Sequence, residues 1–409
     1  VAGQGILVMD NLELIKSLSQ PTSTKIVLLV MDGLGGMPDP ETGKTELETA
    51  RTPNLDGLAR GGSTGLIDIV RPGITPGSSA GHLSLFGYDP LKYNIGRGAL
   101  EAVGIDFELE PGDIAARGNF CSADSEGLIT DRRAGRIDTE ECRKLCLRMD
   151  GMTINNTVLF VRAVREHRFI LVMRGEGLKP GISDSDPQRE GVKPREIRAI
   201  DPAAGDTAET VKGFIEQAKE ILTGHHPANM LLLRGFSTRP DFPSMRGVYR
   251  LRPAAIATYP MYRGLARLVG MEVMETGSSI ENELETLREN YSGYDFFFIH
   301  IKGTDSAGED GDFERKVRVI EDLDRAIPEL MANKPDVLVV TGDHSTPAVL
   351  KGHSWHPVPV LLYSKWCRPD TAMAFGETDC SSGGLGRFHA TSIMSLAMAH
   401  SRKLNKFGA

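Results

Sequence analysis

Cysteine is scarce in this chain, and none of the five cysteines forms a C-x-x-C pair. An odd number of cysteines without that spacing indicates neither a disulfide framework nor a zinc knuckle. Long hydrophobic runs are also missing: the apolar stretch 5–9 is far shorter than a secretory core or a membrane span, and no basic segment precedes it. We therefore expect reduced thiols, no membrane association and a cytoplasmic location.

An excess of basic residues is absent as well. The chain has 47 Lys and Arg against 55 Asp and Glu, a formal net charge of -8. Proteins that bind nucleic acid normally carry a basic face that neutralises phosphates, so we expect a small-molecule substrate and no nucleic-acid partner. Hydrophobic residues make up 40% and charged residues 25%, as in ordinary soluble globular chains. The composition favours no particular oligomeric state.

The length of 409 residues predicts two domains, because single cores usually stop growing near ~250 to 300 residues. Residues 1–21 show no decisive pattern and are interpreted as an N-terminal extension. The sequence pattern changes in the middle of the chain, where loops and arginines are more frequent. We predict a catalytic domain formed by 22–105 and 286–409, interrupted by an inserted α+β domain at 106–285.

Apolar runs predict an α/β fold with a mostly parallel sheet flanked by helices. Near-continuous apolar segments are typical of strands buried on both faces, and a strand, helix, strand order implies parallel pairing. The predicted catalytic strands are 25–31, 65–70, 295–301, 336–341 and 358–363, with helices at 53–61 and 313–331. In the insert we predict a hairpin over 158–173, helices at 207–222 and 261–269, and a strand at 229–233.

Metal-ligand residue types stand where the predicted strands end. In open α/β sheets the ligand crevice lies beyond the carboxyl ends of the strands. The residues there are Asp32 after 25–31, Asp305 and Glu309 after 295–301, Asp343 and His344 after 336–341, and His353 before 358–363. Carboxylates brought that close repel unless cations neutralise them, and mixed carboxylate and imidazole ligation suits Mn²⁺ or Zn²⁺. Any one acid could instead cap a loop, but the set together favours a metal site.

Ser78 is the predicted nucleophile. It follows Pro76 and Gly77 and precedes small residues that allow a tight turn into a helix, where free N–H groups favour a phosphate. A divalent cation would lower the pKa of its hydroxyl. The alternative is that Ser78 only caps the helix. No P-loop, Rossmann glycine fingerprint or G-x-S-x-G elbow is present, which argues against nucleotide transfer and serine-hydrolase chemistry.

Taken together, these motifs resemble the cofactor-independent (2,3-bisphosphoglycerate-independent) phosphoglycerate mutases of the archaeal type, in the alkaline phosphatase superfamily. The resemblance spans nearly all of the chain after residue 24. It rests on 30–33 (VMDG), 52–56 (TPNLD), 76–78 (PGS), 81–85 (GHLSL), 94–102 (NIGRGALEA), 131–136 (DRRAGR), 183–187 (SDSDP), 302–305 (KGTD), 341–344 (TGDH) and the H-S-x-x-P-V-P pattern from His353.

The resemblance implies an isomerase of glycolysis or gluconeogenesis with two divalent metal ions. One ion would be held by Asp32, Ser78, Asp343 and His344, and the other by Asp305, residue 309 and His353. Ser78 would take the phosphoryl group from 3-phosphoglycerate and return it to the other hydroxyl. The inserted domain would close over the substrate and exclude water, which would otherwise hydrolyse the phosphoserine.

Two positions depart from the family pattern. Glu309 stands where the family usually has histidine, which favours Mn²⁺ or Mg²⁺ over Zn²⁺ because the ligand becomes an anionic oxygen. Mn²⁺ is therefore the expected cofactor. Ser79 replaces the acid that commonly follows the nucleophile and would change the polar contacts around the metals and phosphate.

Arginine is expected to bind the substrate, because guanidinium groups pair bidentately with carboxylate and phosphate. Arg132 and Arg133 are the predicted catalytic and substrate-binding arginines, and Lys302 is predicted to hold the transferring phosphoryl group. Further substrate-binding candidates are Arg97, Arg168, Asp184, Arg234 and Arg263. Each could instead be structural. His82, one helical turn after Ser78, could equally pack or carry a proton.

Two other functions fit the same motifs. A metal-dependent phosphomonoesterase or related phosphotransferase would result if the insert closed poorly. A degenerate relative that binds a phosphorylated ligand without turnover is the non-enzymatic alternative, and Glu309 is the residue that leaves it open.

Overall fold

The computed structural model describes residues 11–93 and 95–408, which form two compact units. Of the described residues, the first unit contains 11–93 and 242–408, and the second contains 95–241. The sequence prediction placed the boundaries at 105/106 and 285/286 instead. The second of these is the larger error: residues 242–285, assigned to the insert, carry two strands that belong to the sheet of the first unit.

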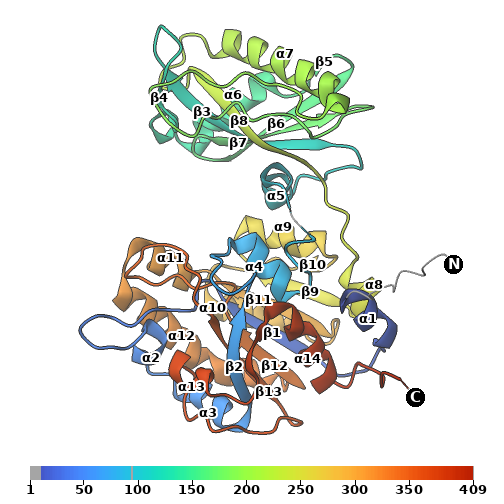
Figure 1. The fold of residues 1–409 in the computed structure, drawn as a ribbon, viewed down its shortest axis with the longest axis vertical. Helices are drawn as coiled ribbons and strands as arrows, with labels where there is room; N and C mark the ends of the chain where they lie inside the picture. The colour runs from blue at the N-terminus through green and yellow to red at the C-terminus, as the bar shows by residue number, and fades with distance from the viewer. Residues whose placement is uncertain (1–10, 94, 409) are drawn as a thin grey trace, which may run out of the picture. The chain divides into compact units, whose positions relative to one another are not determined.

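The first unit is built on an eight-stranded, mostly parallel sheet in the order β10-β9-β11-β1-β12-β13-β2-β14 (Figure 1). Its strands are β1 (Ile26–Met31), β2 (Ser63–Asp68), β9 (Pro253–Ala257), β10 (Glu272–Val273), β11 (Phe296–Ile301), β12 (Val337–Thr341), β13 (Val358–Ser364) and β14 (Gly386–His389). The apolar β1 lies at the centre, parallel to β11 on one side and β12 on the other. The predicted α/β class is confirmed, and the antiparallel β13 makes the sheet mixed.

Eleven described α-helices belong to the first unit. They are α1 (Asn11–Leu18), α2 (Glu46–Thr49), α3 (Pro53–Gly61), α4 (Ser78–Leu85), α8 (Met245–Tyr249), α9 (Pro260–Leu268), α10 (Ile280–Asn290), α11 (Gly303–Asp310), α12 (Phe313–Ala332), α13 (Glu377–Ser381) and α14 (Ile393–His400), with the 3-10 helix η3 (Ala390–Ser392). α12 packs against α2, α3 and α10, whereas α4 packs against α9. Pro53 opens α3 at its first position, as its fixed φ allows.

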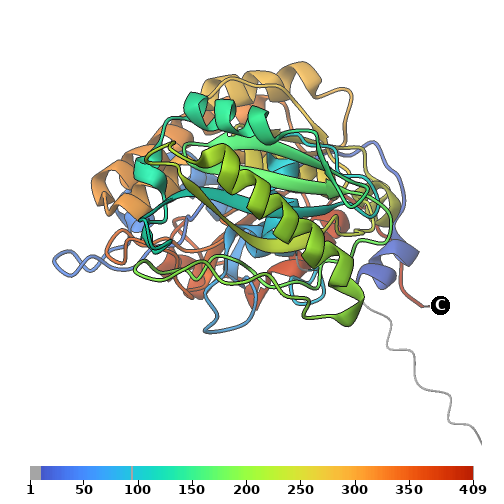
Figure 2. The same ribbon diagram turned by 90° about the horizontal axis from the view of Figure 1, so that it is seen from above.

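The second unit is an antiparallel sheet with helices. Its elements are β3 (Ile114–Ala123), β4 (Ile129–Asp131), β5 (Met152–Ile154), β6 (Thr157–Arg165), β7 (Arg168–Arg174), β8 (Met230–Thr238), α5 (Arg97–Gly104), α6 (Thr139–Met149) and α7 (Gly205–Leu222), with η1 (Ala134–Arg136) and η2 (Pro202–Ala204). β6 and β7 form the predicted hairpin. α6 and α7 lie across one face of this sheet (Figure 2). The apolar side chains of the sheet and of these helices form one buried cluster.

The predicted N-terminal extension, 1–21, is partly outside the described residues, which begin at 11. Residues 11–18 form α1, which buries Leu12 and Ile15 and packs against α8. This part of the segment is therefore a component of the first unit. All five cysteines are free thiols, as expected. Among the described helices, none has the length and apolar character that crossing a membrane requires.

Candidate functional site

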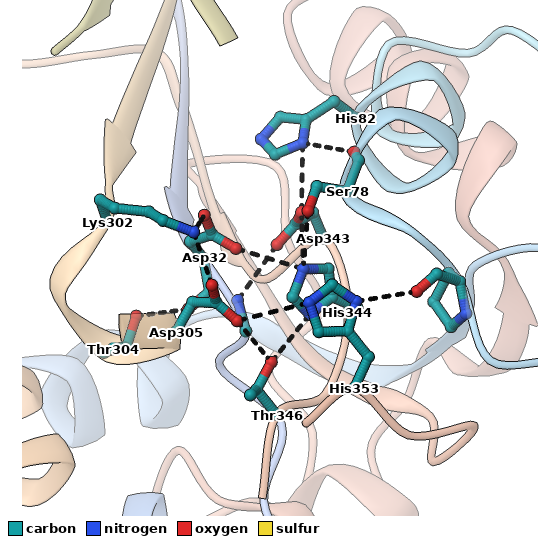
Figure 3. Close-up of polar contacts among 12 residues, drawn as sticks. Asp32, Ser78, His82, Lys302, Thr304, Asp305, Asp343, His344, Thr346 and His353 are labelled. Atoms are coloured by element: carbon teal, nitrogen blue, oxygen red, sulfur yellow. Dashed lines mark hydrogen bonds and ion pairs between the residues drawn. The ribbon is translucent and has the colours of Figure 1, made fainter. Parts of the chain in front are cut away.

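The polar site of the first unit lies where β1, β11 and β12 end. Because these strands run parallel and in register, their carboxyl ends meet at one edge of the sheet. Asp32 follows β1, Lys302 follows β11, and Asp343 follows β12 with Gly342 between them. Their side chains point toward one another, together with Ser78 from the start of α4 (Figure 3).

Asp32, Ser78, Asp343 and His344 form the first candidate metal group. His344 Nε2 lies 3.2 Å from Asp32 Oδ1, 3.3 Å from Asp343 Oδ2 and 3.3 Å from Ser78 Oγ. Both aspartates and the histidine are fully buried. No donor among the described residues makes a hydrogen bond to Asp32 Oδ1 or Asp343 Oδ2. Buried carboxylate oxygens without donors are costly, so this arrangement of oxygens and an imidazole nitrogen fits a divalent cation.

Asp305, His344 and His353 form the second candidate group. His353 Nε2 lies 3.7 Å from Asp305 Oδ1, and its Nδ1 is 3.0 Å from the Pro76 carbonyl oxygen. A carbonyl only accepts, so Nδ1 must carry the hydrogen and Nε2 is free to bind a cation. Glu309 Oε1 is 3.9 Å from His353 Nε2, on a side chain that is 56% exposed. The residues predicted as ligands are thus brought together, with Glu309 at the rim.

Burial and neighbouring charges shift the pKa values of Asp32 and His344. Burial by itself raises the pKa of Asp32, but the neighbouring His300, His344 and Lys302 side chains outweigh it, and the pKa lies well below the usual value. Burial lowers the pKa of His344, yet the charges of Asp343 and Asp32 raise it to about 9. Without a bound cation, the His344 ring is therefore protonated, and its charge supplies part of the positive charge that a cation would bring.

Ser78 is the first residue of α4, and Gly77 is its N-cap, without a side-chain cap bond. Ser78 therefore does not cap the helix; its hydroxyl faces His344 instead. The helix comes this close to the sheet because position 81 is glycine: a Cβ there would lie 2.3 Å from the Asp343 carbonyl oxygen. The N-terminus of α4, with its free N–H groups, is thus directed at the same place as the carboxylates.

Lys302 bridges the two groups. Its Nζ donates to Asp32 Oδ2 at 2.9 Å and to Asp305 Oδ2 at 2.5 Å. Burial lowers the pKa of this ammonium, but the two carboxylates more than compensate and raise it. One lysine cannot balance three buried aspartates, so the site keeps an excess of negative charge.

Sequence reasoning missed Tyr262 and His300. The Tyr262 hydroxyl donates to Asp32 Oδ2 at 2.5 Å, and His300 Nε2 lies 3.3 Å from the same oxygen. Burial raises the pKa of Tyr262, which keeps it a donor. A histidine inside the apolar strand 295–301 was a usable signal for His300. Tyr262 had no such signal, because it stands in a helix that the prediction gave to the other domain.

His82 is a packing residue in this structure. Its ring is fully buried, 4.5 Å from the Tyr262 ring centroid and 5.5 Å from that of Phe298. Its Nδ1 lies 2.9 Å from the Ser78 carbonyl oxygen and 3.2 Å from Asp343 Oδ2. The ring therefore supports the start of α4 and the back of Asp343.

In the second unit, arginines gather around a few acids. Arg132 pairs bidentately with the buried Asp186, at 3.2 Å from Nε to Oδ1 and 2.7 Å from Nη2 to Oδ2. Arg234 Nη1 lies 3.8 Å from Asp186 Oδ2. Asp184 accepts from the Gly235 N–H at 2.8 Å, which gives it a structural role next to Arg234.

Arg117 is the arginine that sequence reasoning missed. It is buried in β3 and bonds Glu101 at 2.9 Å. Burial lowers its pKa to about 10; Glu101 opposes this shift, and the like charges of Arg168, Arg234 and Arg97 add to it. The buried Nε atoms of Arg117, Arg168 and Arg234 find no acceptor among the described residues. A charged residue inside a run of small and apolar residues was the available signal.

The remaining predicted arginines are exposed or belong to the other unit. Arg133 is exposed and its main-chain N–H donates to Asp131. Arg97 is exposed at the first position of α5. Arg263 was predicted in the insert but lies on α9 of the first unit, where it donates to the Met274 carbonyl at 3.2 Å. The reason is that β9, which precedes α9, pairs with β11.

Comparison with known proteins yields one consistent family. A family model described as 2,3-bisphosphoglycerate-independent phosphoglycerate mutase matches residues 59–229. The chain is 50% identical over 402 residues to a probable 2,3-bisphosphoglycerate-independent phosphoglycerate mutase of Thermotoga maritima (98% of this chain, 100% of the relative). It is 48% identical over 406 residues to one of Thermus thermophilus, with the same coverage.

Solved structures agree. A cofactor-independent phosphoglycerate mutase from Thermoplasma acidophilum matches with a TM-score of 0.72 and 33% identity, covering 92% of this chain and 100% of that one. A protein from Pyrococcus horikoshii matches with a TM-score of 0.81 and 30% identity, covering 94% and 99%.

Proposed function

Because the chain belongs to the 2,3-bisphosphoglycerate-independent phosphoglycerate mutase family, we propose that it interconverts 3-phosphoglycerate and 2-phosphoglycerate through a phosphoserine on Ser78. The observation that carries this proposal is the convergence of Ser78 Oγ, His344 Nε2, Asp32 Oδ1 and Asp343 Oδ2 at the N-terminus of α4. A hydroxyl there is suited to accept a phosphoryl group, because carboxylates bind the neutralising cation and helix N–H groups face the anion.

Two groups of ligands support a two-metal site. Asp32, Ser78, Asp343 and His344 would hold one divalent cation, and Asp305, Glu309 and His353 the other. When bound, the cations lower the pKa of the attacking hydroxyl and neutralise the charge of the phosphate.

The phosphoryl transfer proceeds in two balanced steps. In the first, Ser78 Oγ loses its proton as it bonds to phosphorus, while the bond to the 3-oxygen of the substrate breaks and that oxygen gains a proton. In the second, the 2-hydroxyl of glycerate loses its proton as its oxygen bonds to phosphorus, while the bond between phosphorus and Ser78 Oγ breaks and Oγ gains a proton. Lys302, held between Asp32 and Asp305, is the ammonium positioned to bind a phosphoryl oxygen.

Arginines of the second unit are proposed to bind the substrate anions. Arg117, Arg168 and Arg234 each retain a buried Nε–H without an acceptor among the described residues, so a carboxylate or phosphate would satisfy donors that the protein leaves free. Arg132 is held by Asp186 and would present its remaining N–H groups. Arg133 and Arg97, both exposed, are the further candidates for this role.

Mn²⁺ is the proposed metal, with Mg²⁺ next. Glu309 adds an anionic oxygen to the second group, which favours harder cations than the nitrogen of a histidine would. Activity should therefore be higher after reloading apoprotein with Mn²⁺ than with Zn²⁺. Equal or greater activity with Zn²⁺ would argue against an oxygen ligand at position 309.

The test is conversion of 3-phosphoglycerate to 2-phosphoglycerate by Mn²⁺-loaded protein without added 2,3-bisphosphoglycerate, with free phosphate measured in parallel. Conversion with little phosphate release, abolished in Ser78→Ala, is the expected result. Ser84→Ala is the matched control, because Ser84 lies on the same helix and donates only to the Ile69 carbonyl. Phosphate release without isomerisation would identify a phosphomonoesterase. If the protein showed neither activity, the proposal would be wrong.

A further inference from the structure

A single hydroxyl joins the two candidate metal groups. Thr346 Oγ1 lies 2.7 Å from Asp305 Oδ1 and 3.0 Å from His344 Nδ1 (Figure 3). Asp305 belongs to the second group, and Nε2 of His344 faces the ligand atoms of the first. Thr346 itself is fully buried and was not among the residues predicted from the sequence.

The direction of these hydrogen bonds follows from the number of hydrogens. A hydroxyl has one hydrogen and can also accept. The Asp305 carboxylate, already paired with Lys302, only accepts, so the Thr346 hydrogen goes to Asp305. The hydroxyl oxygen must then accept from His344, which places a hydrogen on Nδ1 and leaves the Nε2 lone pair available to a cation.

Thr346 is held firmly by both ligand-bearing segments. Its N–H donates to the carbonyl of Gly35 at 3.0 Å, and its carbonyl accepts from the buried Lys316 ammonium at 2.9 Å. A Cβ at Gly33 would lie 2.5 Å from Thr346 Oγ1, and one at Gly308 would lie 2.2 Å from its carbonyl oxygen. The turn after Asp32 and the helix that bears Asp305 thus pack closely against Thr346.

We propose that Thr346 is a positioning residue that orients ligands of both metal groups at once. Its hydroxyl touches no substrate and is not itself a ligand. Removing it leaves His344 Nδ1 and Asp305 Oδ1 without their partner and frees the imidazole ring to rotate. Both groups should therefore lose metal affinity together, because His344 belongs to both and Asp305 to the second. The inference rests on the proposed two-metal function.

The experiment is titration of metal-free protein with Mn²⁺, followed by calorimetry and by electron paramagnetic resonance of the free ion. The wild-type chain should bind two Mn²⁺. Thr346→Val, which keeps the shape but removes the hydroxyl, should weaken both binding events by about 10- to 100-fold, the range found for partners that orient metal ligands. Thr346→Ser should restore affinities close to wild type.

Thr341→Val is the matched control. Thr341 is equally buried at the end of β12, but its hydroxyl donates to the Pro359 carbonyl at 2.8 Å and not to a candidate ligand. This variant should lose stability without losing Mn²⁺ affinity. If Thr346→Val binds both ions as tightly as Thr341→Val, or weakens only one ion, the proposal is wrong. If the wild-type chain itself does not bind two ions, the two-metal function fails first.

A second measurement does not depend on the folding of a variant. In Mg²⁺-loaded wild-type protein, nitrogen NMR should show His344 with its hydrogen on Nδ1 and none on Nε2, the signal being assigned in the wild-type protein itself. A hydrogen on Nε2 would contradict the arrangement, because the Thr346 oxygen would then have no donor from the ring.

Discussion

The two units carry buried polar clusters of opposite sign. In the first unit, Asp32, Asp305 and Asp343 meet with one lysine between them, and two carboxylate oxygens have no donor among the described residues. In the second, arginines outnumber the acids beside them, and three buried guanidinium nitrogens have no acceptor there. One cluster needs cations and the other needs an anion, because buried charges without partners are costly.

The units also build their clusters differently. The first places its ligands after parallel strands, so the edge of one sheet gathers residues from 32 to 353. The second places arginines within antiparallel strands, where Arg117 on β3 pairs in register with Arg234 on β8. Strand ends give ligands fixed directions toward one point, whereas residues along a strand present a surface. The first arrangement suits an ion, and the second suits an extended anion with two charged groups.

The largest expected effect comes from breaking the acidic cluster. Asp343→Asn should reduce mutase activity by about 10³-fold or more, because it removes a charged ligand beside the nucleophile. Metal analysis should show less than the wild-type content. Asp322→Asn is the control, since Asp322 is exposed on α12 and pairs with Arg325 at the surface. Full activity and full metal content in Asp343→Asn would contradict the inference that the acidic cluster of the first unit needs cations.

The matching change in the second unit should be smaller and of another kind. Arg234→Ala should raise the KM for phosphoglycerate by about 10- to 100-fold, as expected for a charged hydrogen bond of about 1.5–3 kcal/mol. Metal content should stay at two ions per chain. Arg143→Ala is the control, because Arg143 is exposed on α6 and pairs with Glu140. An unchanged KM, or a loss of metal, would show that the arginine cluster does not serve the substrate.

Metal removal should act on one unit only. Ions at a hundred times their Kd stabilise the folded state by about 2.7 kcal/mol, so chelation should increase hydrogen exchange in peptides from β1, β12 and the start of α4. Peptides from β3, β7 and β8 should exchange as before. Equal loss of protection in both units would mean that the acidic cluster is not where the ions bind.

The smallest effect concerns an acid of the first unit that lies outside both clusters. Burial raises the pKa of Glu283 from 4.5 to about 8, and no charge among residues 11–93 and 95–408 is found to oppose the shift. An acid whose folded pKa is raised contributes its full stability below pH 4.5 and loses it as the pH rises through 8. Glu283→Gln should therefore be more stable than wild type by about 1–2 kcal/mol at pH 9 and equal to it near pH 4.5.

Thermal unfolding of Glu283→Gln at the two pH values checks this. Within the first unit, the buried Glu283 contrasts with the buried Asp32. The pKa of Asp32 lies far below the usual value because histidines and Lys302 surround it. A variant no more stable than wild type at pH 9 would show that the pKa of Glu283 is not raised in the folded protein, and that burial alone does not separate these two acids.

Much of the candidate site could be predicted from residue types alone. Asp32, Asp305, Asp343 and His344 each follow an apolar run, and such runs become parallel strands whose ends converge. Ser78 at the start of a helix was likewise local information, since Pro76 and Gly77 precede it. Periodicity and strand-end chemistry need no knowledge of distant contacts.

Other features depend on contacts that no local pattern encodes. The apolar pattern of 253–257 is compatible with a strand in either unit. Its pairing with β11 assigns it to the first unit. That pairing brings Tyr262 to Asp32 and removes Arg263 from the arginine cluster. Thr346 and Arg117 likewise gain their roles from partners far away in the chain. The sequence by itself determined which residue types follow the strands, because that depends on local order along the chain. The tertiary structure alone decided which hydroxyls and rings orient those residues, because hydrogen bonds depend on distance in space.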